Sequence, residues 1–347
     1  MRKKIWIFVL PCMLAFSILF TGCTGEQNTK QTEHTTGLFA MGTYMTLTAY
    51  GENAETALAD AEERIKKLET LWSVTDENSE VYEMNHSNGV PVTISPETEE
   101  LLRFTLEIAE QTGGALDPTI YPLVDAWGFV SGEYRVPAEQ ELMELLQYTG
   151  YEKVSIKGNT VSLPAGTQID LGAVGKGYTG QELSDLLKNQ GITSALLDIG
   201  GNIQMIGRRP DGTKWRLGVK NPFGEGSFGI LEAEDCAVVT SGGYERYFTD
   251  EDGKTYWHIL DPATGRPADS GLASVTIIAE DGSLCDALST AIFVMGMEEG
   301  TTYWRTREDF EMLLMAQDGE IYLTDGIQND FTLEDSFSDK EIHVIER

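Results

Sequence analysis

The sequence predicts a single compact α+β domain, with β-sheets flanked by helices, behind an export signal and a polar tether. The 347 residues, 41% of them hydrophobic, provide enough apolar side chains for a large core. Segments with helical spacing and segments with strand-like composition are mixed along the chain, and strands are more frequent in its second half. Neither an internal repeat nor a long low-complexity linker interrupts the chain after the tether, so we expect one mixed domain.

The N-terminal residues have the pattern of an export signal. Basic residues at positions 2–4 precede an apolar run over residues 5–20, which is too short to span a bilayer comfortably. Residues 19–23 read LFTGC and resemble the end of a bacterial lipoprotein signal, which leaves Cys23 as a lipid-bearing N-terminus; an ordinary cleaved secretory signal is the alternative. We therefore expect a signal peptide over residues 1–22, a flexible tether over residues 23–37, and a protein held at the extracytoplasmic side of the cell membrane by its lipid alone.

Hydrophobic spacing and turn residues place the elements of the domain. Residues 41–50 have the composition of a strand, and apolar residues at Leu58, Ala61 and Ile65 keep helical spacing. Pro137 precedes another helical segment, and Gly191 ends a third. The expected helices span residues 55–71, 101–109, 142–146, 177–190 and 285–293. The expected strands span residues 41–50, 195–199, 215–219, 230–233, 237–240, 256–260 and 272–279, with hairpins over residues 154–163 and around Asp318-Gly319. The domain is expected over residues 38–325, before an acidic, weakly patterned tail over residues 326–347.

The net charge of −31 makes nucleic acid an unsuitable partner, because such a surface repels phosphate backbones. An anionic nucleotide would need a cation or glycine-rich backbone amides at its binding site. Cys236 and Cys285, the two cysteines of the expected domain, are too few for a disulfide framework. We expect buried thiols, with a single bridge as the alternative.

The densest collection of chemically capable side chains lies between residues 240 and 290. It contains Ser241 beside glycines, His258, an Asp261-Pro262 turn, and the pair Asp286 and Thr290. Asp286 and Thr290 are four residues apart, so they lie on one face of the expected helix. Their carboxylate and hydroxyl are hard oxygen ligands, which suit Mg²⁺ better than zinc. Each side chain also has an ordinary structural role as a helix cap, a hydroxyl bonded within its helix or a hydrogen-bonded strand residue. Together they predict a site.

A glycine-rich turn over residues 169–178 predicts an anion site. A strand delivers Asp170, three glycines follow, and a helix starts near Gly177 with Lys176 beside it. Backbone amides at a helix start bind anions, and the lysine adds a positive charge. The glycine spacing fits neither the dinucleotide-binding fingerprint nor a P-loop. Weaker signals are the Met41-Gly42-Thr43 turn, the block over residues 113–129 with its Asp117-Pro118 turn, and the polar turn over residues 198–202.

In their order along the chain, these motifs resemble those of the ApbE family, the FAD:protein FMN transferases. The likeness rests on Met41-Gly42-Thr43 and on the segments 114–129, 170–177, 198–202, 240–246, 258–265 and 286–290. It covers residues 37–322, and many members of the family are lipoproteins. The resemblance implies an ApbE-like fold and a flavin-transfer reaction. With Mg²⁺ bound, FAD is cleaved, FMN is attached by a phosphoester to a threonine or serine of an acceptor protein, and AMP leaves.

The resemblance also implies roles for individual residues. FAD would be contacted by Met41, Thr75, Ala115, Leu116, Asp117, Asp170, Lys176, Ser241 and Ile259. Thr75 stands where the family often carries an aromatic residue. Mg²⁺ would be held by the Ala173 carbonyl, Asp286, Ser289 and Thr290.

The chemistry of the residues agrees with such a reaction, because phosphoryl transfer depends on positioning and on charge neutralisation, which Mg²⁺ supplies. We expect His258 and Asp286 to be catalytic. A histidine has a suitable pKa for taking the proton of the acceptor hydroxyl, and Asp261 or Asp286 is the competing base. The acceptor is expected to be an exported or membrane redox protein. The alternatives are a Mg²⁺-dependent FAD pyrophosphatase, which gives FMN and AMP, and a non-enzymatic flavin-binding lipoprotein.

Overall fold

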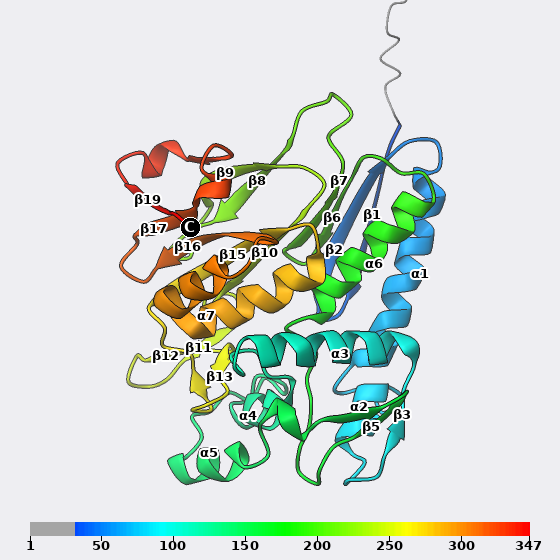
Figure 1. Cartoon of the computed structure of the whole chain (residues 1–347), viewed down its shortest axis with the longest axis vertical. Helices are drawn as coiled ribbons and strands as arrows, with labels where there is room; N and C mark the ends of the chain where they lie inside the picture. Colours follow the sequence, from blue (N-terminus) through cyan, green and yellow to red (C-terminus); the bar gives the residue numbers. More distant parts are fainter. Residues whose placement is uncertain (1–31) are drawn as a thin grey trace, which may run out of the picture. The chain divides into compact units, whose positions relative to one another are not determined.

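A nine-stranded β-sheet organises the fold in the computed structural model, which describes residues 32–347 (Figure 1). All neighbouring strands are antiparallel except the last pair, which is parallel. In spatial order the strands are β1 (Glu33–Ala40), β2 (Thr43–Tyr50), β6 (Ala195–Ile199), β7 (Asn202–Ile206), β10 (Ala237–Gly242), β15 (Leu272–Ala279), β16 (Phe310–Ala316), β17 (Ile321–Thr324) and β19 (Ile342–Ile345). The expected signal peptide and the lipidation at Cys23 lie outside the described residues.

Helices cover one face of this sheet and a smaller sheet covers the other. The helices are α1 (Ala54–Trp72), α6 (Gly175–Asn189) and α7 (Gly282–Arg305); the smaller sheet consists of β8 (Trp215–Lys220), β9 (Ser227–Ala233) and β18 (Phe331–Leu333). Two consecutive residues of β10 show both interfaces. Val239 belongs to the core that contains Leu288 of α7, whereas Val238 packs with Phe228 of β9. The predicted α+β architecture, with sheets flanked by helices, is confirmed.

The remaining elements are the helix α3 (Pro96–Gln111), three short helices and several short strands. In Figure 1, α3 crosses the molecule, with the large sheet above it and the short helices α2 (Glu80–Asn85), α4 (Tyr121–Ala126) and α5 (Glu139–Leu146) below it. Ser95 caps α3 by accepting a hydrogen bond from the Thr98 N–H group, and Pro96 takes its first position. The short strands are β3 (Val92–Thr93), β4 (Ser155–Lys157), β5 (Thr160–Ser162), β11 (Tyr247–Thr249), β12 (Thr255–Trp257), β13 (Leu260–Asp261) and β14 (Arg266–Pro267).

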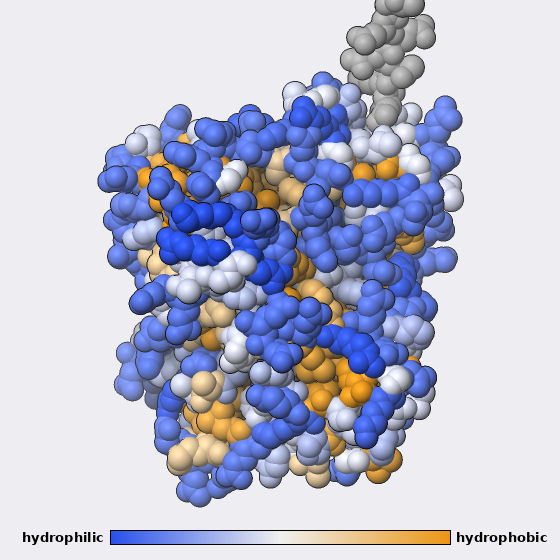
Figure 2. Space-filling view, in the orientation of Figure 1, coloured by the Kyte–Doolittle hydropathy of each residue, from blue (hydrophilic) through white to orange (hydrophobic). Residues whose placement is uncertain are grey.

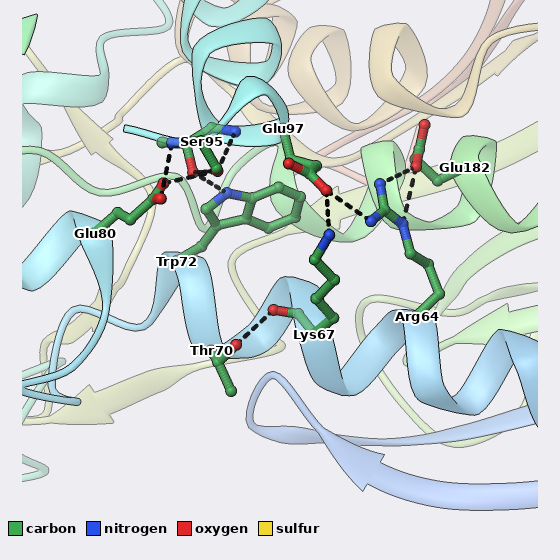
Figure 3. Close-up of polar contacts among 9 residues, drawn as sticks. Arg64, Lys67, Thr70, Trp72, Glu80, Ser95, Glu97 and Glu182 are labelled. Carbon is green, nitrogen blue, oxygen red and sulfur yellow. Dashed lines mark hydrogen bonds and ion pairs between the residues drawn. The ribbon is translucent and has the colours of Figure 1, made fainter. Parts of the chain in front are cut away.

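A cluster of ion pairs ties α1 to α3 and α6 (Figure 3). Glu97 at the start of α3 accepts hydrogen bonds from Arg64 Nη1 at 2.9 Å and from Lys67 Nζ at 2.5 Å. The same Arg64 donates to Glu182 of α6 at 2.5 Å. Because the Glu97 side chain is only 16% exposed, solvent screens these pairs less than it screens most surface ion pairs.

The Glu97 pair predicts a pH-dependent part of the stability. Hydrogen bonds from Lys67 and Arg64 lower the pKa of Glu97 from 4.5 to about 2. A carboxyl whose pKa is lower in the folded state stabilises fully above its unfolded pKa, and this stabilisation is lost as the pH falls from about 4.5 towards 2. Glu97→Gln is expected to lower the free energy of unfolding at pH 7 by about 1–3 kcal/mol and to flatten its pH dependence in that window. Urea unfolding at pH 7, 5, 4 and 3 measures both effects.

The control for this prediction is Glu99→Gln on the same helix. Among residues 32–347, Glu99 forms an ion pair with Arg103 alone, whose side chain is 48% exposed, so its loss is expected to cost less than about 0.5 kcal/mol. Equal effects of the two substitutions at pH 7 would contradict the role given to Glu97.

The five predicted helices are confirmed in place, but the structure corrects both ends of the expected domain. The tether was predicted to reach residue 37, whereas β1 begins at Glu33 because residues 33–40 pair along their whole length with β2. The segment predicted as a tail over residues 326–347 contains β18 and β19. Ile345 of β19 is 9% exposed and pairs with β17 at Thr324. Its few alternating apolar residues are hard to recognise within an acidic composition.

The two cysteines of the domain are free. Cys285 is fully buried in the core beneath α7, and its thiol donates weakly to the Ala237 carbonyl at 3.6 Å. Cys236 packs instead with the core under the smaller sheet. The prediction of free thiols is confirmed, but only Cys285 is fully buried, whereas Cys236 is partly buried.

The surface seen in Figure 2 is mostly hydrophilic, with apolar patches in its lower half. No helix within residues 32–347 is long and apolar enough to cross a membrane.

Candidate active site

The N-termini of α6 and α7 meet beside the sheet and define the centre of the candidate site. Helix α6 begins directly after the glycine-rich turn, and α7 begins behind its cap Asp281, which accepts a hydrogen bond from the Ser283 N–H group at 2.7 Å. Asp286 lies one turn further along α7, and its Oδ2 accepts a hydrogen bond from the Gly177 N–H group of α6 at 2.8 Å. The carboxylate therefore lies where the amides and the dipole of α6 favour a negative charge.

The close approach of these helices depends on Gly177. A Cβ atom there would lie 2.2 Å from the Gly282 carbonyl oxygen and 2.5 Å from Asp286 Cβ. Gly177→Ala is expected to force the helices apart, to displace the Asp286 carboxylate and to lower the free energy of unfolding by about 1–3 kcal/mol, which urea unfolding measures. The control is Gly175→Ala, two residues earlier, where the new Cβ would lie 3.7 Å from the Trp72 ring. Equal stability of the two variants would contradict this packing argument.

Three hydroxyls lie close together next to Asp286. Ser241 at the end of β10 places its Oγ 2.8 Å from Ser289 Oγ and 3.3 Å from Thr290 Oγ1. Ser289 Oγ donates to the Asp286 carbonyl at 2.9 Å, so its proton is used within the helix and its lone pairs face outward. The structure thus brings together four residues that the sequence singled out, from a strand and a helix that are far apart in the chain.

The donor set at this point is suited to a hard cation. Within residues 32–347, no three His, Cys, Asp or Glu side chains form a metal-binding cluster, and no hydrogen-bond donor reaches the Ala173 carbonyl oxygen. One carboxylate, the hydroxyls and a free backbone carbonyl are all oxygen ligands, as Mg²⁺ prefers, and they leave coordination positions for phosphate or water. Lys176 Nζ lies 4.0 Å from Asp286 Oδ1 and adds a cation beside them.

Asp170 is held between two other segments. Its N–H group donates to the Pro118 carbonyl at 2.8 Å, and the preceding Ile169 exchanges two hydrogen bonds with the Asn85 side chain of α2, at 2.7 and 2.9 Å. Burial raises the pKa of Asp170, and the Gly172 amide with the positive charges of Arg246 and Lys176 partly offsets this. These opposing effects place Asp170 on the same side of the site as both cations.

The Asp117 carboxylate is used within the protein. It accepts hydrogen bonds from the Thr119 N–H group at 2.8 Å, the Thr119 hydroxyl at 2.6 Å and the Tyr151 N–H group at 2.9 Å. Burial raises its pKa despite these donors. These bonds fix the turn that contains the partly buried Ala115 and the buried Leu116. The next residue, Pro118, accepts the hydrogen bond from the Asp170 N–H group.

His258 lies in the connection between β12 and β13, not within one continuous strand over residues 256–260 as predicted. Its backbone N–H group and its Nδ1 both donate to the Arg246 carbonyl at 3.1 Å. Because a carbonyl only accepts, this partner assigns the proton to Nδ1 and leaves Nε2 free as a base. Burial, assisted by the charges of Arg246 and Lys176, lowers the pKa of His258 to about 4. The ring is therefore neutral at pH 7.

The other predicted contacts are distributed around this centre. Met41 lies in the turn between β1 and β2, where its N–H group donates to Glu69 at 2.6 Å and its sulfur accepts from the Thr179 hydroxyl of α6 at 3.7 Å. Ile259 is buried next to His258. Thr75 is exposed in the loop after α1, and within residues 32–347 no hydrogen bond joins it to the polar groups of the site.

Sequence reasoning missed Trp72 and Tyr121 near the site and gave Arg246 no role. Trp72 meets Tyr178 edge to face, with ring centroids 5.5 Å apart, at the start of α6. The pKa of Tyr121 is raised by burial and by negative charges that include Asp170, which places this ring near that carboxylate. Trp72 follows the apolar spacing of its helix and therefore looks like an ordinary core residue. Arg246 had the stronger signal, since it stands inside the predicted motif.

A separate hollow of about 760 Å³ lies along the last turns of α7. Its lining residues are Gln111, Glu298, Glu299, Thr302, Tyr303, Thr306 and Arg307. It contains none of the predicted site residues.

Comparison with known proteins gives consistent matches. The ApbE family model matches residues 41–314, which include every candidate site residue of the domain. The FAD:protein FMN transferase of Klebsiella pneumoniae (strain 342) is 34% identical over 266 residues, which are 75% of this chain and 82% of that protein. The crystal structure of the ApbE protein of Thermotoga maritima matches with a TM-score of 0.81 and 34% identity over 86% of this chain and 99% of its own. The flavin transferase ApbE of Vibrio cholerae matches with a TM-score of 0.78 and 28% identity over the same shares.

Proposed function

The chain belongs to the ApbE family, and from this premise we propose that it is an FAD:protein FMN transferase. Its substrates are then FAD and an acceptor protein. The observation that carries the proposal is the convergence of Asp286, the hydroxyls and Lys176 at the N-terminus of α6, within a chain that matches the family over residues 41–314.

The proposed reaction is a direct phosphoryl transfer. The oxygen of an acceptor threonine or serine attacks the phosphorus of the FMN half of FAD, the bond from that phosphorus to the AMP oxygen breaks, and AMP leaves. His258 is proposed to take the hydroxyl proton on Nε2, which is unprotonated and neutral at pH 7. Asp261 is a poorer candidate base, because its carboxylate accepts from the Ala263 N–H group at 2.9 Å and from the Thr264 hydroxyl at 3.0 Å.

We propose that Asp286, Thr290 and the Ala173 carbonyl hold Mg²⁺, with Ser289 as a further oxygen ligand. The bound ion would neutralise charge on the pyrophosphate. Lys176 and the amides of the α6 N-terminus are proposed to bind the pyrophosphate oxygens. Their cluster would concentrate positive charge in a protein of net charge −31.

The remaining contacts with FAD are proposed at Met41, Asp170, Ser241, Ile259 and the turn over residues 115–117. The structure adds Tyr121 and Trp72 as aromatic neighbours of this region, whereas Thr75 offers no ring. The acceptor is proposed to be an exported or membrane redox protein, reached by an enzyme that Cys23 anchors through lipid.

The proposal is tested by incubating the mature protein with FAD, Mg²⁺ and membrane proteins of the source cell. Covalent flavin is detected by fluorescence of a denaturing gel, and AMP and free FMN are quantified in the supernatant. We expect a fluorescent acceptor band and AMP in excess of free FMN, both abolished by EDTA. Rapid metal-dependent release of free FMN that acceptor protein does not suppress would favour the pyrophosphatase. FAD binding with neither product would favour a flavin-binding lipoprotein.

A further inference from the structure

Arg246 contacts both His258 and Phe129: its carbonyl accepts from His258, and its guanidinium donates to the Phe129 carbonyl. We propose that it is a positioning residue for flavin transfer: its carbonyl orients the His258 ring, and its guanidinium holds residues 242–246 against Phe129. The inference rests on the proposed function only in taking His258 as the base. The contacts themselves belong to the fold and can be tested without turnover.

The carbonyl of Arg246 makes two contacts with one residue. It accepts from the backbone N–H group of His258 and from its Nδ1, each at 3.1 Å. The first bond fixes the backbone and the second fixes the rotation of the ring. A ring held in this way carries its proton on Nδ1 and presents Nε2 as the acceptor, so one main-chain oxygen sets both orientation and tautomer.

The guanidinium attaches the same residue to a rigid part of the fold. Its Nη2 donates to the Phe129 carbonyl. Phe129 is 2% exposed, and the neighbouring Trp127 is fully buried and donates from Nε1 to the Gly265 carbonyl at 2.8 Å. The Phe129 ring also meets the His258 ring at 6.2 Å between centroids. Arg246 and Phe129 therefore fix the imidazole from two sides.

The other anchor of this loop is weaker. Lys220 donates to Glu245 at 2.8 Å and lies 4.8 Å from the Tyr244 ring centroid. The side chains of Lys220 and Glu245 are 55% and 48% exposed, and exposed pairs of this kind contribute little to positioning. Of these two side-chain anchors, Arg246 therefore has the more buried partner.

The charges that face His258 are both positive. Arg246 and Lys176 approach it from different elements, the apolar Phe129 ring packs on it, and Arg246 also faces Asp170. Removal of the Arg246 charge is therefore expected to raise the pKa of His258, while Lys176 and burial keep it below that of a free histidine.

The test compares Arg246→Met and Arg246→Lys with Arg216→Met in the full mature chain. Arg216 is a surface residue of β8 whose side chain is 64% exposed. The chain has four histidines, so the ¹⁵N signals of His258 can be assigned by comparison with His258→Gln. Tautomer and pKa are read by NMR, kcat by transfer assays from pH 5 to 9, and FAD affinity by fluorescence titration.

In the wild type we expect a proton on Nδ1 and none on Nε2 at pH 7. Arg246→Met is expected to raise the pKa of His258 by about one unit, to produce a mixture of tautomers, and to lower kcat about 10–100-fold with FAD affinity changed less than about threefold. Arg246→Lys is expected to restore the low pKa and only part of kcat, because lysine lacks the forked donor. Arg216→Met should match the wild type in all readouts.

An Arg246→Met protein that melts like the wild type but keeps its His258 tautomer and pKa would overturn the proposal, and so would undiminished kcat. If the wild type transfers no flavin, the proposed function fails, while the NMR readouts still decide whether Arg246 positions His258.

Discussion

Asp286→Asn is expected to reduce FMN transfer by about 10³-fold. The amide oxygen of asparagine can still accept the hydrogen bond that Gly177 donates at 2.8 Å, so the packing of α6 on α7 is retained. What is lost is the negative charge that would hold Mg²⁺, and a metal ion contributes several kcal/mol to the stabilisation of a phosphoryl-transfer transition state.

The measurement combines transfer assays over a range of Mg²⁺ concentration with calorimetric titration of Mg²⁺ in the presence of FAD. Asp281→Asn is the matched control: it lies on the same helix, five residues earlier, and asparagine is as good a cap as aspartate. Asp281→Asn should leave the Mg²⁺ requirement unchanged. Wild-type transfer by Asp286→Asn at the wild-type Mg²⁺ concentration would refute the metal role.

His258→Gln is expected to lower kcat by about 10²–10⁴-fold, the usual contribution of a general base. In the wild type, kcat should rise as the pH increases through about 4, the pKa that burial and the two nearby cations give His258, and should be level above about pH 5. The base acts when it is deprotonated, so the activity is lost on the acid side. This acid limb of the pH profile, the fall of kcat below about pH 5, should be absent from the residual activity of His258→Gln.

His86→Gln serves as the control, because His86 is exposed and stacks on Tyr82 with ring centroids 3.8 Å apart. The stability of the protein also changes in this pH range, because the unfolded chain binds a proton at His258 near pH 6.5 and the folded chain only near 4. The folded state therefore loses stability as the pH falls between these values, and each kinetic point requires a check of folding. An acid limb that persists in His258→Gln would assign the base to another group, with Asp261→Asn as the next variant.

The sequence predicted much of this site because helical spacing is a local property. Asp286 and Thr290 could be placed on one face from their separation alone, and the glycines before Lys176 indicated a helix N-terminus that binds anions. The contact between Gly177 and Asp286 could not be predicted in the same way. It depends on how closely two helices pack, which is set by glycines that are about a hundred residues apart in the chain.

The misses have similar causes. The resemblance implies an FAD contact at the turn that contains Asp117, but the sequence does not show that Thr119 and Tyr151 donate hydrogen bonds to its carboxylate. The sequence predicts a tail where β19 lies, because only the pairing with β17 distinguishes this strand from an exposed acidic segment. Arg246 stands inside the predicted motif, but its contact with His258 runs through the main-chain oxygen, which sequence patterns do not report.

The free thiols of Cys236 and Cys285 have a consequence for how the protein is made. Within residues 32–347 the fold contains no disulfide, so it depends on no oxidation step and reduction has no cross-link to break. Folding should proceed equally well with or without reductant and should need no thiol oxidoreductase. Active enzyme is therefore expected from a reducing cytoplasm as readily as from an oxidising compartment.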